Sequence, residues 1–267
     1  MDGFSDMMAR LLLLGYTEGN VEEKLAQDLV LAALDKCGYR DRLTIKGGVV
    51  MANLSKDVRR ATLDLDLDFM HYPLTDETID ALISAMNNVS AGIEIIRVGD
   101  IMELKQQDYS GKRVYLSLQD GKGGVLQYKL DIGVHTQPRI GQVNMEFDLA
   151  GSGPAELWAN GPEQVFAEKL KSLLRLGTIS NRAKDMFDMV YLIDRVDRDK
   201  LPEVMRIVIY DDKRMMENGI GDVLTRLSRI FADATYMARL AVRRTNWLAI
   251  DPKTATGTLL KFLATTA

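Results

Sequence analysis

The most regular pattern of apolar and polar positions in the chain is the alternation of leucine and aspartate that follows Thr62. Three leucines and three aspartates alternate strictly from Leu63 to Asp68. This alternation predicts a half-buried β-strand, because successive side chains of a strand point to opposite faces. We therefore expect the leucines, Leu63 included, to enter a core and the aspartates to line the other face with Thr62. Aspartate is a poor strand residue, and neighbouring carboxylates repel, so this face needs either a hard cation such as Mg²⁺ or full solvation.

The remaining pattern predicts a mixed sheet with helices, followed by a helical region. Apolar residues at helical spacing predict helices over 4–15, 21–37, 49–54 and a segment that Thr75 caps. Leu43–Ile45 reads as a strand, and largely alternating segments between residues 92 and 149 predict several more, with a hairpin turn at 120–124. Glycine and proline at 151–154 and 160–162 indicate a boundary, with Pro162 as the first residue of a helix.

Composition narrows the class of protein. The chain has 267 residues, 46% of them hydrophobic, which is enough for one large domain or two modest ones. The single cysteine, Cys37, excludes a disulfide framework, and the longest apolar run near the start, Leu11–Leu14, is too short to cross a membrane. We expect a cytoplasmic protein without a membrane partner. The net charge is −4, with acidic residues in excess before residue 162 and a mild basic excess after it, which alone does not indicate nucleic acid.

The turn Lys46-Gly47-Gly48 lies between the first predicted strand and a short helix. Two glycines let the backbone approach a ligand closely, and amides at the start of a helix favour phosphate, although turns often use such a pair. Arg60 and Thr62 share the face of the aspartates if that strand extends back to residue 60. Arg60 is then either a structural ion-pair partner or a contact for phosphate.

Three further acidic residues and one lysine complete the candidate chemistry. Asp131 lies near the end of an apolar strand, where two-metal sites often take a third carboxylate, although a strand-end turn is the plainer interpretation. Lys169 lies within the apolar stripe of its helix and must meet an anion or reach water. Asp185 and Asp188 share one side of an apolar helix, so we expect them to pair with Lys169, in a structural salt bridge or a functional site. Lys171 lies off the stripe and is expected to be solvated.

The order of these motifs resembles the AbiEii/AbiGii toxin family of the polymerase β-like nucleotidyltransferase superfamily. The resemblance spans residues 40–195 and is carried by Lys46-Gly47-Gly48, Arg60-x-Thr62-x-Asp64-x-Asp66, Asp131, Glu168-Lys169 and Arg182-x-Lys184-Asp185-x-x-Asp188. It implies an α+β fold, in which a polymerase β-like nucleotidyltransferase core of mixed sheet and helices is followed by a helical C-terminal lobe. The first lobe would span residues 1–155, and the helical lobe, residues 160–267, would complete the cleft for a nucleoside triphosphate (NTP).

The same resemblance implies that a nucleoside monophosphate is transferred from an NTP to an acceptor. As in the similar MenT toxins, the acceptor would be the 3′ end of tRNA. The chain would be the toxin of an abortive-infection or type IV-like toxin–antitoxin system, with a cognate antitoxin as partner. The catalytic residues that it implies are Asp64, Asp66, Asp131, Lys169 and Asp185. The nucleotide-binding residues that it implies are Lys46, Gly47, Gly48, Arg60, Thr62, Arg182 and Asp188.

In that scheme, Asp64, Asp66 and Asp131 hold two Mg²⁺ ions, the glycine amides cradle the β- and γ-phosphates, and Lys169 neutralises phosphate charge. Asp68 lies outside the motif and is treated as peripheral.

Other functions remain open on the sequence. A protein that AMPylates other proteins would share the fold, and so would a non-catalytic interaction protein. A glycosyltransferase would use Asp-x-Asp but has no use for the glycine turn. Arginines late in the chain form either an RNA-facing surface or a solvated helical face; they are Arg226, Arg229, Arg239, Arg243 and Arg244.

Overall fold

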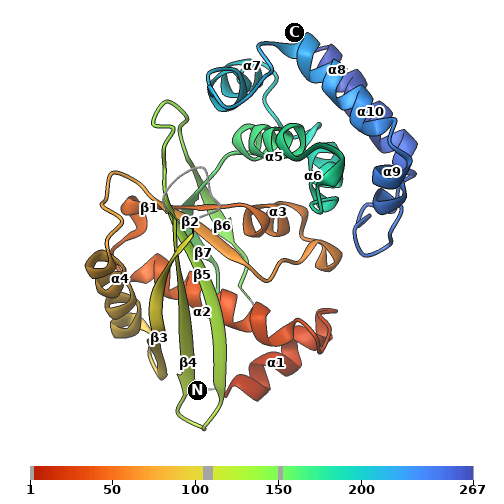
Figure 1. Cartoon of the computed structure of the whole chain (residues 1–267). Coiled ribbons are helices and arrows are strands. Elements are labelled where there is room, and N and C mark those ends of the chain that lie inside the picture. Colours follow the sequence, from red (N-terminus) through yellow and green to blue (C-terminus); the bar gives the residue numbers. More distant parts are fainter. Residues whose placement is uncertain (1–2, 105–110, 150–152, 267) are drawn as a thin grey trace. The chain divides into compact units, whose positions relative to one another are not determined.

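The computed structural model describes residues 3–104, 111–149 and 153–266, and its chain divides into two compact units, Met1–Asn160 and Gly161–Ala267 (Figure 1). Of the residues that indicate a boundary in the sequence, Gly151 and Ser152 lie outside the described ranges. Across those ranges, no helix is both long and apolar enough to cross a membrane.

The first unit is built around a seven-stranded sheet, which confirms the predicted mixed sheet (Figure 1). Its strands lie in the order β3-β4-β5-β2-β1-β7-β6. They are β1 (Leu43–Lys46), β2 (Leu65–Phe69), β3 (Ile93–Leu104), β4 (Gly111–Asp120), β5 (Val125–Val134), β6 (Val143–Phe147) and β7 (Ala155–Ala159). The pairs β2–β5 and β1–β7 are parallel, whereas the other neighbours run antiparallel.

Strand alternation gives the sheet one apolar face and one charged face. On the apolar face, Val114, Leu130 and Leu65 lie opposite one another across β4, β5 and β2, and all three are fully buried. Helices α2 (Val21–Lys36) and α4 (Asp76–Val89) pack on this face: the amide of Gln27 in α2 donates to the hydroxyl of Tyr128 in β5 (3.2 Å). The residues between these apolar positions therefore point to the other face, where the candidate site lies.

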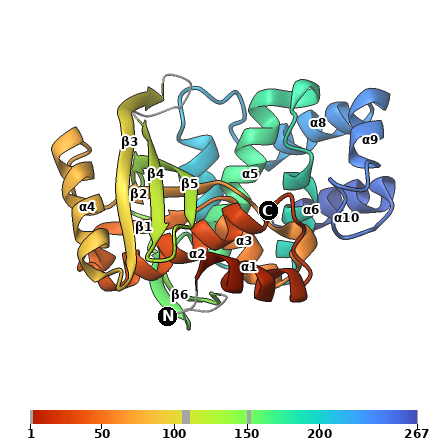
Figure 2. The ribbon, with the colours of Figure 1, turned by 90° about the horizontal axis from the view of Figure 1, so that it is seen from below.

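Helix α4 begins at its predicted cap, since the Thr75 hydroxyl accepts a hydrogen bond from the Thr78 amide. Its predicted stripe is buried: Ile79, Leu82, Ile83 and Met86. The other helices of this unit are α1 (Phe4–Leu13) and α3 (Gly48–Ser55), which confirm the predicted helices with shifts of one or two residues at their ends. Figure 2 shows α4 alongside β3.

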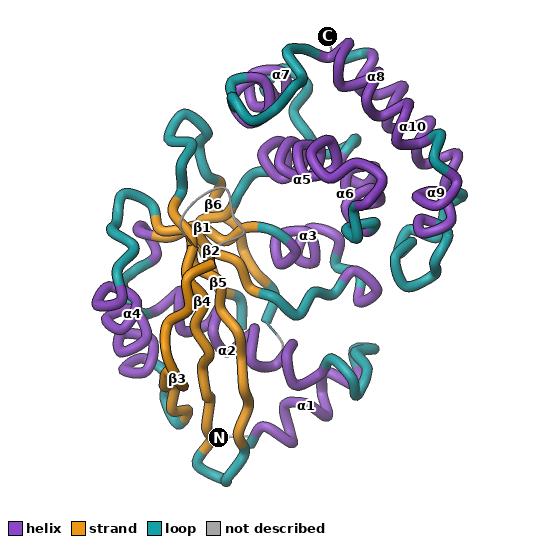
Figure 3. Tube along the Cα trace, viewed as in Figure 1, coloured by secondary structure: helices purple, strands orange, loops and turns teal. Residues whose placement is uncertain are grey.

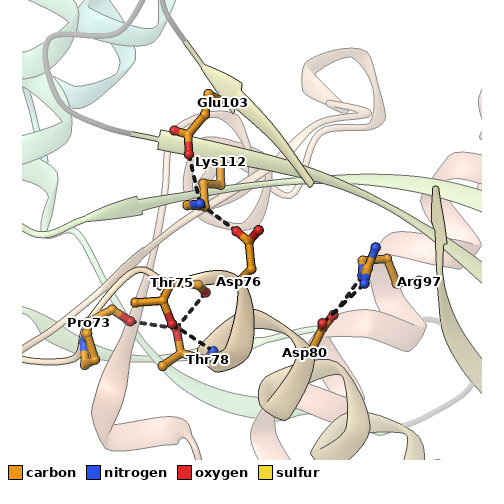
Figure 4. Close-up of polar contacts among 8 residues, drawn as sticks. All are labelled: Pro73, Thr75, Asp76, Thr78, Asp80, Arg97, Glu103 and Lys112. Atoms are coloured by element: carbon orange, nitrogen blue, oxygen red, sulfur yellow. Dashed lines mark hydrogen bonds and ion pairs between the residues drawn. The ribbon is translucent and has the colours of Figure 1, made fainter. Parts of the chain in front are cut away.

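Ion pairs join α4 to the neighbouring strands (Figure 4). The Lys112 ammonium of β4 lies 2.6 Å from Asp76 of α4 and 2.8 Å from Glu103 of β3. The Arg97 guanidinium of β3 donates to both oxygens of Asp80, at 2.7 and 3.2 Å. Lys112 therefore points to the helix-covered face, and its neighbour on β4, residue 113, points to the charged face.

Two strand predictions need correction. The aspartate strand begins only at Leu65, and Leu63 is 42% exposed instead of buried. The reason is the partner strand, because β1 pairs with β2 only as far as Lys46 opposite Asp66 and then turns away at Gly47. Residues before Leu65 consequently lack a β1 partner.

The backbone upstream differs from the prediction too, because Arg60 lies in a 3₁₀ turn, Val58–Arg60. The side chain of Asp57 caps this turn by accepting from the Arg59 amide at 2.8 Å. Arg60 is therefore not on the strand face. Strand β7, which was not predicted, lies between β1 and β6.

The second unit is helical, as predicted (Figure 3). Its α-helices are α5 (Pro162–Leu176), α6 (Lys184–Leu192), α7 (Leu201–Met205), α8 (Ile220–Phe231), α9 (Ala234–Leu240) and α10 (Pro252–Ala264). Pro162 is the first residue of α5, where a missing amide hydrogen does not matter. The rings of Phe166 in α5 and Phe262 in α10 pack edge to face at 5.7 Å, which joins the first and last helices of the unit.

Candidate active site

The glycine turn packs directly against the aspartate strand. Gly47 has φ +69° and ψ −137°, a conformation that L side chains rarely adopt, and Gly48 begins α3. A Cβ on Gly47 would lie 2.8 Å from Asp66 Oδ2, and one on Gly48 would lie 2.6 Å from Thr62 Oγ1. The glycine turn and the aspartate strand are thus in direct contact, and there is no room for a side chain at either glycine.

Four charged residues form a row across the charged face of the sheet. Strand register places Arg113 of β4 opposite Asp131 of β5, Asp131 opposite Asp66 of β2, and Asp66 opposite Lys46 of β1. Two carboxylates therefore lie side by side with a cation at each end. The Arg113 guanidinium holds Asp131 through two hydrogen bonds, Nε to Oδ1 at 2.7 Å and Nη2 to Oδ2 at 2.8 Å.

The aspartates on either side of Asp66 are also paired. Lys129 of β5 forms an ion pair with Asp64, whose side chain is 57% exposed. The Lys46 ammonium lies 2.6 Å from Asp68, which is buried. Asp68, which the motif left out, thus belongs to the same charged cluster, because strand alternation returns it to the same face.

Asp66 lies among other carboxylates and is largely shielded from water. Burial raises its pKa, the Lys46 ammonium opposes that rise, and the carboxylates of Asp131, Asp64 and Asp68 add to it. A further cation close to Asp66 would relieve this repulsion. A small pocket opens at the row, lined by Lys46, Asp66, Leu104, Gly111, Asp131, Ile132 and Gly133.

The carboxylates fit a magnesium ion in part. Within the described ranges, no group of three His, Cys, Asp or Glu side chains could hold a metal ion as it lies. Mg²⁺, however, is usually held by one or two carboxylates together with substrate phosphates and water. Asp64, which is exposed, and Asp66, which is crowded by like charge, suit that role. Both oxygens of Asp131 instead accept hydrogen bonds from Arg113.

A second group of predicted residues meets in the helical unit. The Lys169 ammonium of α5 lies 2.6 Å from Asp185 Oδ1 and 2.8 Å from Asp188 Oδ2, both on α6. This confirms the predicted pairing of the inward lysine. Asp188 is fully buried, whereas the Asp185 side chain is 17% exposed. Asp188 therefore anchors the ammonium from inside, and Asp185 holds it near the surface.

One residue of this group was not predicted. The indole N–H of Trp247 donates to Asp188 Oδ1 at 3.0 Å, and Trp247 is buried. No sequence motif marks Trp247, because it precedes α10 and its link to α6 depends on helix packing. The indole adds a hydrogen bond to a fully buried carboxylate that also pairs with Lys169.

Other basic residues differ in their surroundings. Arg182 is exposed, and its backbone amide donates to the Ser180 hydroxyl at 3.2 Å. Lys171, expected to be solvated, is only 19% exposed at its side chain and lies 2.5 Å from Asp212. That expectation was wrong because Asp212 comes from a distant segment that only the tertiary fold brings to α5.

The late arginines divide into two groups. Arg226 and Arg239 turn inward and donate to backbone carbonyls, Arg226 to Leu174 at 3.4 Å and Arg239 to Thr178. They therefore bind the C-terminal end of α5 and the turn after it. Arg229, Arg243 and Arg244 are exposed. A surface for RNA would have these three, not five, of the candidate arginines.

These features place the chain among the nucleotidyltransferases. The family described as "Nucleotidyl transferase AbiEii toxin, Type IV TA system" matches residues 29–257, and the chain belongs to that family. No curated protein matches the chain. The matched range contains every predicted site residue and extends beyond the resemblance seen in the motifs at 40–195. The predicted family and fold class are both confirmed.

Proposed function

We propose that this protein transfers a nucleoside monophosphate from an NTP to a hydroxyl group at the 3′ end of tRNA. The hydroxyl oxygen attacks the α-phosphorus and forms the new P–O bond. The bond from the α-phosphorus to the bridging oxygen breaks, pyrophosphate leaves with the electron pair, and the hydroxyl proton passes to water. Such chemistry depends mainly on positioning and charge neutralisation, which the residues of the charged face can supply.

The observation that carries this proposal is the packing of Gly47 against Asp66 and of Gly48 against Thr62. It sets the first amides of α3 beside a row of carboxylates. Amides at a helix start bind phosphate oxygens, and carboxylates bind the cation that accompanies a triphosphate. Asp64 and Asp66 would hold Mg²⁺, which supplies charge neutralisation at the phosphates. A Cβ on either glycine would collide with Asp66 or Thr62 and so disturb this arrangement.

The remaining predicted residues support the same chemistry. Lys46 balances the charge of Asp68 and lowers the electrostatic strain on Asp66. In the helical unit, Lys169 is held at a fixed position by two carboxylates, which suits a lysine that neutralises phosphate charge. Asp185 and Asp188 then act by orienting the ammonium.

The proposal is tested by incubating the purified chain with Mg²⁺, each α-³²P-labelled NTP in turn, and either total tRNA or cell protein. We expect label in tRNA, and mass spectrometry of the 3′ ends should find one or more added nucleotides. Asp66→Ala should abolish labelling with an unchanged circular dichroism spectrum. Asp80→Ala, which removes a carboxylate of helix α4 on the opposite side of the sheet, should label as the wild type does.

The other outcomes identify the alternatives. Label in protein and none in RNA would mean that the acceptor is a protein, as in AMPylation. Absence of label, together with no Mg²⁺-dependent NTP binding by calorimetry, would favour a non-catalytic interaction protein. If tRNA is the target, expression of the wild type in cells should arrest growth, and expression of Asp66→Ala should not. The cognate antitoxin should relieve the arrest.

A further inference from the structure

Asp131 is bound to an arginine in a way that leaves it poorly suited to bind metal. Both of its oxygens accept charge-assisted hydrogen bonds, from Arg113 Nε and Nη2, in the two-point geometry that makes such pairs strong. Its side chain is only 11% exposed. A metal ion at Asp131 would have to bind the remaining lone pairs of these oxygens close to the guanidinium, and the two positive charges would repel each other.

The surroundings of Arg113 keep it on the charged face. The residues opposite Arg113 on the neighbouring strands are Asp131 on β5 and Met102 on β3. The carboxylate that the strand register places opposite Arg113 is therefore that of Asp131. Lys112, next along β4, is committed to Asp76 and Glu103 on the opposite face. Strand geometry therefore fixes the direction of Arg113, and the two hydrogen bonds fix its guanidinium plane.

The pair leaves part of the guanidinium available for an anion. A guanidinium carries five N–H donors, and the bonds to Asp131 use one edge of the group. The side chain of Arg113 is 29% exposed, more than that of Asp131. Tyr115, two residues along β4 on the same face, also lies close to the guanidinium. Arg113 belongs to the same row of charged residues across the sheet as Asp66, the carboxylate that packs against Gly47.

We infer that Asp131 is a positioning residue that holds Arg113, and that Arg113, not a metal ion at Asp131, contacts a phosphate group of the nucleotide. The inference rests on the proposed nucleotide transfer and adds a residue to its site. It gives Asp131 a different task from Asp64 and Asp66. A planar arginine held by a carboxylate loses little freedom when it binds phosphate, which favours tight and specific contact.

The inference is tested with a double-mutant cycle of Arg113→Gln, Asp131→Asn and the double variant. Binding is measured by calorimetry with the α,β-methylene analogue of each NTP in the presence of Mg²⁺. Binding of Mn²⁺ alone is measured by electron paramagnetic resonance. We expect each single variant to bind the nucleotide analogue about tenfold more weakly, and the double variant to be no weaker than either, because the two residues act as one unit. Affinity for Mn²⁺ should not fall by more than about twofold in any of the three variants.

Arg97→Gln is the matched control, since it breaks a similar two-point pair, with Asp80, on the opposite face. It should leave both affinities unchanged. A loss of Mn²⁺ affinity in Asp131→Asn that is absent in Arg113→Gln would overturn the inference, and so would wild-type nucleotide binding by Arg113→Gln. If Arg113→Gln does not fold, the same two affinities are measured with Arg113→Lys, which keeps the charge but loses the two-point geometry. If the wild type itself binds no nucleotide, the proposed function fails instead.

Discussion

Substitution of Gly47 by alanine tests both the fold of the site and its chemistry. Gly47 has φ +69° and ψ −137°, a backbone conformation that costs a residue with a side chain about 1–3 kcal/mol. The added methyl group would also lie 2.8 Å from Asp66 Oδ2, which is closer than real Cβ contacts come. The carboxylate or the turn must therefore move, which adds a cost of about 1 kcal/mol or more through the strained side chain.

We expect Gly47→Ala to lower the free energy of unfolding by about 2–4 kcal/mol, the sum of these two contributions. Urea unfolding followed by circular dichroism measures that change, and filter binding of ³²P-labelled tRNA measures transfer. Because the methyl group displaces Asp66 and covers the turn, transfer should fall by at least about 100-fold, even when most of the protein is folded.

Two matched variants separate the contributions. Gly38 also has positive φ, +80°, but a Cβ there meets nothing within 4 Å, so Gly38→Ala should show only the backbone cost and normal transfer. Gly48 does not have a positive φ, but a Cβ there would lie 2.6 Å from Thr62 Oγ1. Gly48→Ala should therefore show the steric effect alone. If Gly47→Ala and Gly38→Ala were equal in both stability and transfer, the close packing of Gly47 against Asp66 would be refuted.

Three further predictions concern the helical unit. Lys169→Met removes a cation that pairs with the fully buried Asp188 and should destabilise the unit by about 3–5 kcal/mol in urea unfolding; a loss below 1 kcal/mol would contradict the importance of this buried pair. Trp247→Phe keeps the ring but removes the N–H that Asp188 accepts, so we expect a loss of about 1–3 kcal/mol, and an unchanged stability would show that the bond is not needed. Hydrogen bonds from Arg214 and Lys171 lower the pKa of Asp212 below its ordinary value. A lowered pKa in the folded state stabilises the protein above the unfolded pKa of about 4, and that contribution is lost as pH falls. Asp212→Asn should therefore lose less stability than wild type when pH is lowered from 6 to 3, and a parallel decline of both proteins would refute the role of this carboxylate.

The local pattern of the sequence was enough to predict most elements of this protein. The buried stripe of α4, the cap at Thr75 and the start of α5 at Pro162 depend on interactions within a few residues, and all three were confirmed. The motifs also selected the side chains that we propose for the site. Alternation predicted that Asp66 and Asp68 share a face, because the period of a strand is a property of the backbone.

Contacts between distant segments could be decided only by the tertiary structure. Strand β7 has five residues, and its place within the sheet depends on pairing with β1, which lies more than 100 residues earlier in the chain. Leu63 follows the leucine pattern yet is exposed, because its strand lacks a neighbour there. The pairing of Arg113 with Asp131 follows from the register of β4 against β5, which no motif contains.

The sequence by itself thus determined the type of chemistry, through the identity and spacing of its glycines, carboxylates and lysine, and it determined the family. The tertiary structure decided which distant groups meet: Arg113 with Asp131, Lys171 with Asp212, and the indole N–H of Trp247 with Asp188. The physical reason is that residue type and local period set what a segment can form and which face it shows. Strand register and helix packing, which bury distant segments together, set which charges come within hydrogen-bonding distance.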